Sequence, residues 1–446
     1  MKHIAINEIK VKKLFGYLNY VIKNEDLNKI QQLIILYGDN GSGKTTILKL
    51  LFFLLSSKEQ AGHKSEIARL KFQEFQVILN NGISVGAIRT SRRQIGAYKY
   101  YIKKNDIIIH QVDMVPDPGP EFTILMTKST QKEIEEFQNI LAYLRNLDLR
   151  LFYLTDSRKA LDVGITNFSE PESDFHYTEF EGAFIESNIQ REYARKRKSQ
   201  SEDINTTIRL LENFIKSKTI EASVIGEQKT TDIYLSIVKG VTTDLLQDTD
   251  LSSKVDDLRD ILNEVIQRSV VFSNLGFISD SEFKKILPAF RAKSSQKLGL
   301  IYKILEPYIK GLQAKLDALT VIQQQVSSFI DGLNSYFKNK QIMFSIKEGF
   351  KILQDYSGEE LEFNKLSSGE KQLVQVFANV ILASSKATIF IVDEPEISLN
   401  IKWQRNLLKT LLDFNSTGSM QFIMATHSIE LITNYNDFVI RLNSKN

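Results

Sequence analysis

Short apolar runs and helix-length periodic segments alternate along the first 156 residues, and this pattern predicts a mixed α/β lobe. Asn81-Gly82 separates two of the runs, and Asn105-Asp106 separates the next two. Asn-Gly is a strong signal for a two-residue turn, so we expect antiparallel hairpins here. The predicted strands are 4–11, 17–22, 33–37, 71–79, 83–89, 97–103, 107–112 and 149–154, and the predicted helices are 46–55 and 130–146.

Between residues 157 and 340 the strand signals fade and charged helical segments predominate. The longest, 294–338, has apolar residues mostly at alternating three- and four-residue steps, close to a heptad repeat. This predicts a helical insertion with one antiparallel pair as a short coiled coil; a plain helical core domain is the alternative. Glycine and proline predict interruptions of any long rod. These residues are Gly226, Gly240, Gly276, Pro288 and Pro307. The apolar seam comprises Leu305, Tyr308, Leu312, Leu316, Leu319, Ile322, Val326, Phe329, Leu333 and Phe337, and the other predicted helices are 203–218, 229–248, 252–270 and 280–291.

Strand signals return at 341–348 and 350–354. Two unbroken apolar runs follow, at 388–392 and 421–425. Strands of a parallel sheet have this character, because helices cover both faces of the sheet. We therefore expect two α/β lobes separated by a helical insertion. The expected segments are 1–156, 157–340 and 341–446.

Residues 38–45, Gly-Asp-Asn-Gly-Ser-Gly-Lys-Thr, carry the most specific chemical signal in the chain. They match G-x-x-x-x-G-K-[ST] at every fixed position, after a strand-like run and before a helix-like run. Glycines let backbone N–H groups converge on phosphate at the positive end of a helix. We expect Lys44 to bind the β- and γ-phosphates of a nucleotide and Thr45 to bind Mg²⁺. The expected phosphate-binding residues are Gly38, Asn40, Gly41, Ser42, Gly43, Lys44, Thr45 and Thr46.

Acidic residues follow the apolar run 388–392, and a histidine follows the run 421–425. Ligands of α/β sheets bind at the carboxyl ends of the strands, so these side chains are expected near the phosphates. Asp393 is placed to hold Mg²⁺ through its water shell, and Glu394 to polarise the attacking water. His427 is expected to contact the γ-phosphate; a hydrogen-bonded polar residue with no catalytic role is the alternative.

A third motif, Ser367-Ser368-Gly369-Glu370, opens a periodic helix. Ser367 three residues before Glu370 is the signature of a capping box, which by itself indicates only a well-capped helix. The same helix start also offers hydroxyl and N–H groups to an anion. Both interpretations can hold together.

Composition narrows the class of protein. With 446 residues, 42% of them hydrophobic and 25% charged, the chain has enough material for several globular domains. It contains no cysteine, which excludes disulfides and thiolate chemistry and fits a reducing cytoplasm. It has neither an apolar stretch long enough to span a bilayer nor a signal-peptide core, so no membrane partner is expected. The net charge of +3 neither indicates nor excludes a nucleic-acid partner.

The order of these motifs resembles that of ABC-type ATPases of the SMC/RecF-like branch, in which a helical insertion precedes the Leu366-Ser367-Ser368-Gly369-Glu370 signature. Residues 394–399, Glu-Pro-Glu-Ile-Ser-Leu, resemble the D-loop of that branch. The short insertion is most similar to standalone ATPases of bacterial antiphage systems, including OLD-like, PARIS-type and Septu-type proteins. The resemblance implies an α/β fold: an ABC-type P-loop ATPase head with a mixed sheet, an antiparallel β subdomain and a helical or short coiled-coil insertion.

The resemblance also implies ATP and Mg²⁺ as cofactors, and a homodimer or higher homo-oligomer formed through the heads. Ser367, Ser368 and Gly369 of one copy would contact the γ-phosphate that the other copy holds, with Glu370 in the same motif. The implied catalytic residues are Glu394, His427 and Lys44, and the implied metal ligands are Thr45 and Asp393.

The sequence departs from the family pattern at one position, and one family residue is not located. Asn400 stands where many relatives have histidine, so communication across the dimer is expected to differ. The glutamine of the Q-loop is left open between Gln94 and Gln111.

The resulting hypothesis is an ATPase that acts as sensor and scaffold for a separate nuclease or toxin, with DNA or a phage protein as trigger. The chain ends shortly after His427, so we expect the effector to be another protein. A RecF-type DNA-repair ATPase and a nucleotide-binding structural module with little turnover are the alternatives. A basic run could support DNA contact, although a run of this kind is more often a solvated helix face or a loop. The run consists of Arg191, Arg195, Lys196, Arg197 and Lys198.

Overall fold

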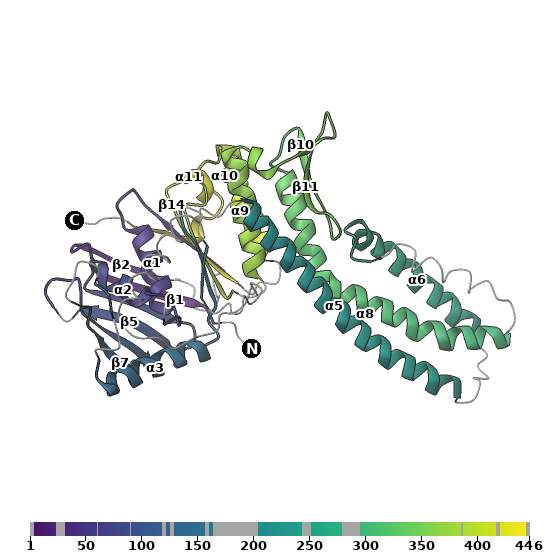
Figure 1. The fold of residues 1–446 in the computed structure, drawn as a ribbon, viewed down its shortest axis with the longest axis horizontal. Coiled ribbons are helices and arrows are strands. Elements are labelled where there is room, and N and C mark those ends of the chain that lie inside the picture. Colours follow the sequence, from purple (N-terminus) through teal and green to yellow (C-terminus); the bar gives the residue numbers. More distant parts are fainter. Residues whose placement is uncertain are drawn as a thin grey trace, which may run out of the picture. The chain divides into compact units, whose positions relative to one another are not determined.

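A computed structural model describes most of the chain, and its helices and strands are drawn in Figure 1. Packing divides the chain into two compact units, Met1–Asp203 with Gln375–Asn446, and Ile204–Val374. The boundaries expected at 157 and 340 mark changes of sequence pattern, which need not coincide with packing units. They therefore stay predictions. The described residues are 4–23, 32–59, 61–89, 91–117, 122–124, 129–156, 160–163, 204–242, 251–278, 295–384, 387–415 and 420–442.

The first unit contains an antiparallel six-stranded sheet of order β2-β1-β4-β5-β6-β7. Both predicted hairpins are confirmed, because β4 pairs with β5 and β6 pairs with β7. The turns use backbone with positive φ, 78° at Gly82, 49° at Asn105 and 66° at Asp106. The strands are β1 (Ile6–Leu14), β2 (Leu18–Lys23), β4 (Glu74–Leu79), β5 (Ile83–Arg89), β6 (Tyr98–Lys104) and β7 (Ile107–Met114).

The other sheet of this unit has the order β15-β3-β14-β13-β8-β9 and is parallel except at β9. Strand β3, from the start of the chain, lies between β14 and β15, from its end. The two predicted lobes therefore share one sheet, and the predicted α/β class is confirmed. The strands are β3 (Leu33–Tyr37), β8 (Leu151–Leu154), β9 (Ala160–Val163), β13 (Ile389–Asp393), β14 (Gln421–Thr426) and β15 (Val439–Arg441).

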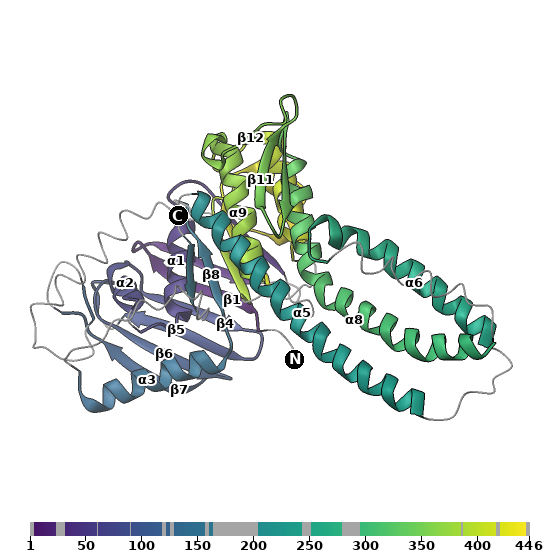
Figure 2. The ribbon, with the colours of Figure 1, turned by 45° about the vertical axis from the view of Figure 1, so that its right-hand side comes forward.

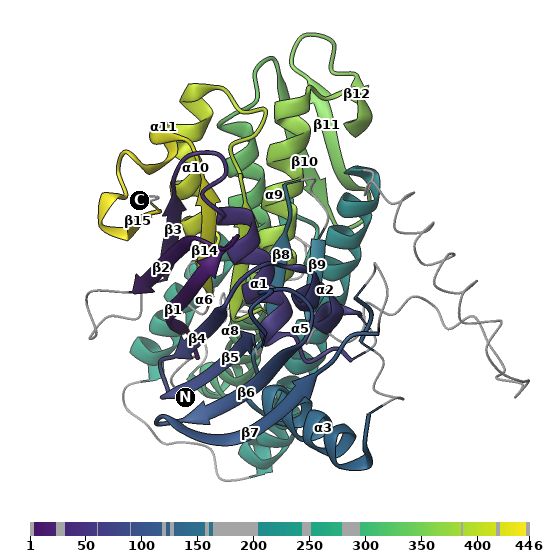
Figure 3. The ribbon, with the colours of Figure 1, turned by 90° about the vertical axis from the view of Figure 1, so that its left-hand side faces the viewer.

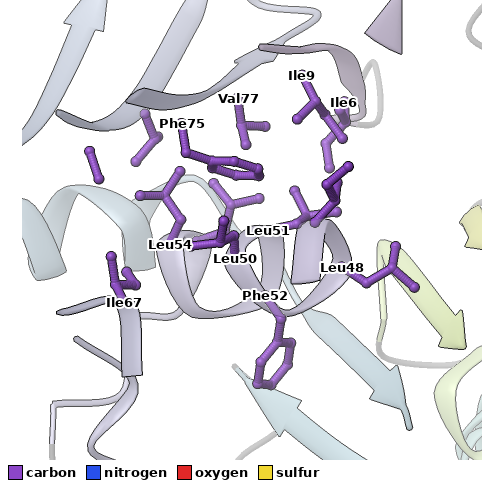
Figure 4. Close-up of a cluster of buried hydrophobic side chains, with 14 of the residues drawn as sticks. Ile6, Ile9, Leu48, Leu50, Leu51, Phe52, Leu54, Ile67, Phe75 and Val77 are labelled. Carbon is purple, nitrogen blue, oxygen red and sulfur yellow. The ribbon is translucent and has the colours of Figure 1, made fainter. Parts of the chain in front are cut away.

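Helix α1 (Lys44–Leu55) lies between the two sheets, as Figure 3 shows. Leu51 and Leu54 point toward Phe75 and the antiparallel sheet, whereas Phe52 points to the opposite side of the helix (Figure 4). A helix covered on both sides is apolar nearly all round, which explains the run of aliphatic and aromatic residues after the phosphate loop. The other helices of this unit are α2 (His63–Arg69), α3 (Gln131–Asn146), α10 (Ile401–Asp413), α11 (Ile429–Ile432) and the 3-10 turn η4 (Asn436–Phe438).

The second unit is built around the longest helix, α8 (Ser295–Asn334). Figure 2 shows α8 beside both α5 and α6, with α5 running in the opposite direction. The predicted seam is buried from Leu312 to Phe337, while the coiled-coil form remains a prediction. The other elements are α5 (Ile204–Thr242), α6 (Leu251–Asn274), the antiparallel strands β10 (Lys340–Ser345), β11 (Gly349–Gln354) and β12 (Glu360–Leu361), and the 3-10 turn η3 (Phe363–Lys365). Helix α9 (Ser368–Ser384) contains the boundary between the units.

The predicted interruptions are wrong at three positions. Helix α5 continues through Gly226 and Gly240, and α8 continues through Pro307. A glycine costs a helix only about 1 kcal/mol relative to alanine, which packing along a long helix offsets. Gly276 does end a helix, because it follows α6 with φ 76°. Pro288 and the predicted helix 280–291 lie outside the described residues.

Within the described ranges, no helix combines the length and the apolar character that a membrane span requires.

Candidate nucleotide-binding and catalytic site

The phosphate loop joins β3 to α1 through backbone that glycine adopts most easily. Gly41 and Gly43 have φ of 84° and 87°. A Cβ on Gly43 would lie 2.6 Å from Cδ2 of Leu14, so a side chain there would force Leu14 to move. Gly43 is the N-cap of α1, where the first N–H groups lack partners within the helix. The loop therefore ends at a helix terminus that favours an anion.

Lys44 and Ser42 present polar groups within this loop. The Lys44 side chain is 5% exposed, and its ammonium donates to the carbonyl oxygens of Gly38 at 2.7 Å and Asp39 at 3.0 Å. The Ser42 hydroxyl is buried and has no hydrogen-bond partner among the described residues. An unsatisfied buried hydroxyl costs about 1–3 kcal/mol, so a ligand oxygen here would relieve it. Both residues fit a bound phosphate.

The predicted metal ligands Thr45 and Asp393 meet at the carboxyl edge of the parallel sheet. Asp393 ends β13 and is completely buried, and the Thr45 side chain interacts with its carboxyl group. Burial raises the pKa of Asp393 to about 6; the interaction with Thr45 works to lower this pKa, and the nearby charges of Asp156 and Glu394 raise it. A site where a carboxylate is costly to ionise is one that a cation would stabilise.

This pair fits Mg²⁺. The ion prefers hard oxygen donors and usually takes only one or two protein ligands, with phosphate and water completing its shell. A hydroxyl and a carboxylate beside a phosphate loop supply that donor set.

Two residues near Asp393, Tyr153 and Asp156, were not predicted from the sequence. Tyr153 lies opposite Ile391 in the β8–β13 pairing, so its side chain shares a face of the sheet with Asp393, two residues further on. Burial raises the pKa of Tyr153, and the charges of Asp393 and Asp156 raise it further, so the hydroxyl stays neutral beside Asp393. Tyr-Leu-Thr-Asp at the end of a predicted strand was the available signal, but the sequence alone did not give the pairing partner.

Glu394 and His427 also come together. The backbone N–H of Glu394 bonds to the carbonyl of Ala425 at 2.9 Å, which ties the end of β13 to the end of β14. Nδ1 of His427 lies 3.3 Å from Oε1 of Glu394, and the histidine side chain is 49% exposed. A carboxylate and an accessible imidazole therefore stand side by side at the edge that carries the phosphate loop.

A second carboxylate, Glu396, approaches the same histidine and was not predicted as a site residue. It is 3% exposed, and its Oε1 lies 3.5 Å from Nδ1 of His427. Oε1 also accepts hydrogen bonds from the Thr426 hydroxyl and from the His427 N–H, the latter at 3.1 Å.

The signature motif forms the predicted capping box at the start of α9. The N–H and hydroxyl of Ser367 donate to Oε2 of Glu370 at 2.9 and 2.8 Å, and the Glu370 N–H donates to the Ser367 hydroxyl at 3.4 Å. Lys340 pairs with Oε1 of Glu370 at 2.9 Å. Burial works to raise the pKa of Glu370, but the hydrogen bonds from Ser367 and Lys340 outweigh it and lower that pKa. Glu370 is thus engaged within its own unit, whereas Ser368 is exposed beside it.

Three further predictions concern Asn400, the Q-loop glutamine and the basic run. Asn400 is the N-cap of α10, because its side chain accepts from the Trp403 N–H at 3.1 Å. Gln94 accepts at its carbonyl from the Phe72 N–H, and Gln111 is exposed on β7, so the Q-loop glutamine stays open. The basic run 191–198 lies outside the described residues.

Comparison with known proteins gives a match along nearly the whole chain. A family model described as AAA ATPase domain matches residues 5–432. The probable ABC transporter ATP-binding protein p29 of Mycoplasma pneumoniae (strain ATCC 29342 / M129 / Subtype 1) is 32% identical over 80 residues, 18% of this chain and 32% of that protein. The chain therefore spans about a third of the length of this relative.

Solved structures of Smc head domains are also similar. One, from Pyrococcus furiosus, has an extended coiled coil and is bound to the C-terminal domain of ScpA. It is 12% identical, with 97% of this chain and 92% of that chain covered and a TM-score of 0.39. Another, with a coiled coil and joint, is from Pyrococcus yayanosii, at 12% identity, coverage of 97% and 93%, and a TM-score of 0.35.

Proposed function

Because the chain belongs to the AAA ATPase domain family, we propose that it is a Mg²⁺-dependent ATP hydrolase of the ABC type. One observation carries this proposal: the phosphate loop, the Thr45–Asp393 pair and the Glu394–His427 pair meet at one edge of the parallel sheet. Ligands of open α/β sheets bind at this edge.

The residues divide the chemistry between them. Lys44 and the N–H groups at the start of α1 hold the β- and γ-phosphates. Thr45 and Asp393 would hold Mg²⁺, which neutralises charge on the phosphates when bound. Glu394 orients the attacking water and takes its proton. The imidazole of His427 contacts the γ-phosphate beside it.

Closure of the site would require a second copy of the chain. Ser367, Ser368 and Gly369 would bind the γ-phosphate that the other copy holds, so that ATP joins two heads. The exposed Ser368 and the anion-favouring start of α9 support this arrangement. Hydrolysis would then separate the heads.

For the cellular role, we propose a cytoplasmic sensor and scaffold that controls a separate nuclease or toxin in antiphage defence. The support is the similarity of the signature and short insertion to standalone defence ATPases. DNA or a phage protein would be the trigger. A RecF-type repair ATPase is the alternative, and it shares the same ATP chemistry.

Two assays test the proposal. Phosphate release from ATP should require Mg²⁺ and stop with EDTA; the absence of any turnover, with or without DNA, would overturn the ATPase assignment. Cells that express the chain with its neighbouring reading frames should resist phage, and Glu394→Gln should abolish resistance. The RecF-type alternative would be favoured if the variant left resistance unchanged. It would also be favoured if the cells did not resist phage and ATP turnover by the protein depended on DNA.

A further inference from the structure

The segment between β13 and α10 contains two non-glycine residues in the left-handed region, Glu394 with φ 48° and Ser398 with φ 66°. Each such residue costs about 1 kcal/mol or more, so surrounding interactions must hold the backbone in this form. The segment is also where Glu394, the proposed base, is placed. Its conformation therefore bears directly on the chemistry.

Glu396 provides one of those interactions, and it does so from inside the protein. Its Oε1 accepts hydrogen bonds from the Thr426 hydroxyl and the His427 N–H, which lie at the end of β14. Its Oε2 is buried and has no hydrogen-bond partner among the described residues. A buried carboxylate is costly even when it is hydrogen-bonded, so a residue needed only for packing would be apolar here.

A second bridge joins the same two segments. The amide N–H of Gln404, on α10, donates to the carbonyl of Leu399 at 2.8 Å. The hydroxyl of Ser428 donates to Oε1 of Gln404 at 2.6 Å. The segment 394–399 is thus joined to the segment 426–428 at Glu396 and, through Gln404, at Leu399.

We propose that Glu396 is a positioning residue for His427, and this inference rests on the proposed ATPase function. The carboxylate fixes the backbone that carries the imidazole. It also places a second oxygen near Nδ1, at 3.5 Å, beside that of Glu394 at 3.3 Å. Two acceptors facing Nδ1 keep a proton on that nitrogen, and Nε2 is left for the ligand. Glu396 does not touch the nucleotide; it acts through His427.

A double-mutant cycle tests this inference. In the folded protein, Glu396→Ala should lower kcat roughly 10- to 100-fold, the range observed when groups that orient metal-bound histidines are removed, with little change in ATP affinity. In a His427→Ala background the same substitution should cause no further loss, because its effect passes through the imidazole. Equal losses in both backgrounds, or a loss that matches a fall in folded protein, would overturn the inference.

Two controls accompany the cycle. Glu396→Gln keeps the shape and one acceptor oxygen, so it should lose only several-fold in kcat and serves if the alanine variant does not fold. Glu430→Gln removes a half-buried carboxylate that pairs with Arg405 and should leave turnover unchanged.

Turnover by the unmodified protein decides the proposed function separately. Nuclear magnetic resonance of ¹⁵N-labelled imidazoles needs no turnover, and the chain has only five histidines to assign. Glu396→Gln should shift the tautomer of His427. An unchanged His427 spectrum would overturn the inference even if ATP is not hydrolysed.

Discussion

Asp393 shows how one residue can serve a site while opposing stability. It is completely buried, with the carboxylates of Asp156 and Glu394 nearby and only Thr45 and Lys49 acting in the favourable direction. An incompletely compensated buried charge destabilises a fold, so its presence indicates a function that needs the charge. The sequence located Asp393 and Glu394, because both follow an unbroken apolar run. The sequence did not indicate that Tyr153 lies near Asp393, because this depends on which strand pairs with β13.

The Glu394→Gln variant should retain ATP but hydrolyse it about 10²- to 10⁴-fold more slowly, because the amide cannot accept the proton of the attacking water. Phosphate release and ATP affinity, measured on the same preparation, check this. The matched control is Glu74→Gln, which removes a carboxylate on the antiparallel sheet that pairs with Lys12. A Glu394→Gln protein that hydrolyses ATP at the normal rate would contradict the assignment of the base.

Gly43→Ala and Gly41→Ala form a matched pair in the phosphate loop. Both positions have positive φ, so each alanine should cost about 1–2 kcal/mol of unfolding free energy. Only the Cβ at Gly43 meets Leu14, at 2.6 Å; the Cβ at Gly41 meets no atom of the described residues within 4 Å. Denaturant unfolding should therefore show the larger loss for Gly43→Ala. Equal losses would mean that the contact with Leu14 relaxes freely.

At the scale of elements, local signals predicted well and long-range ones did not. Asn81-Gly82 gave a hairpin, and Ser367 with Glu370 gave a capping box, because those interactions lie within a few residues. The order of strands in the parallel sheet, with β3 between β14 and β15, was beyond pattern reasoning. The continuous helix through Pro307 was also missed, since burial of its apolar side offset the proline.

The cap of α9 should make stability depend on pH through Glu370. Its pKa in the folded protein is below the ordinary value of 4.5, so the carboxylate stabilises the fold above that pH, and the contribution is lost as pH falls through the folded pKa. Relative to Glu370→Gln, the natural protein should be more stable by about 1 kcal/mol at pH 7. The advantage should shrink below pH 4.5. Urea unfolding at both pH values measures it, and a difference independent of pH would contradict this account.

For the whole molecule, the central claim is that one ATP site is completed by two copies of the chain. The phosphate loop comes from the start of the sequence, and the carboxylates and His427 come from its end, all within the first unit. The signature Ser367-Ser368-Gly369 belongs to the second unit. A site divided in this way would make ATP the link between two heads.

Mixing two inactive variants tests this claim most directly. Lys44→Ala disables the phosphate loop but leaves the signature intact, whereas Ser368→Arg disables the signature but leaves the phosphate loop intact. Each alone should hydrolyse little ATP. In an equal mixture, half of the random pairs combine the two variants and hold one complete site of two, so activity should return to about a quarter of the natural level. A mixture that stays as inactive as its components, although the variants pair, would contradict a site shared between copies.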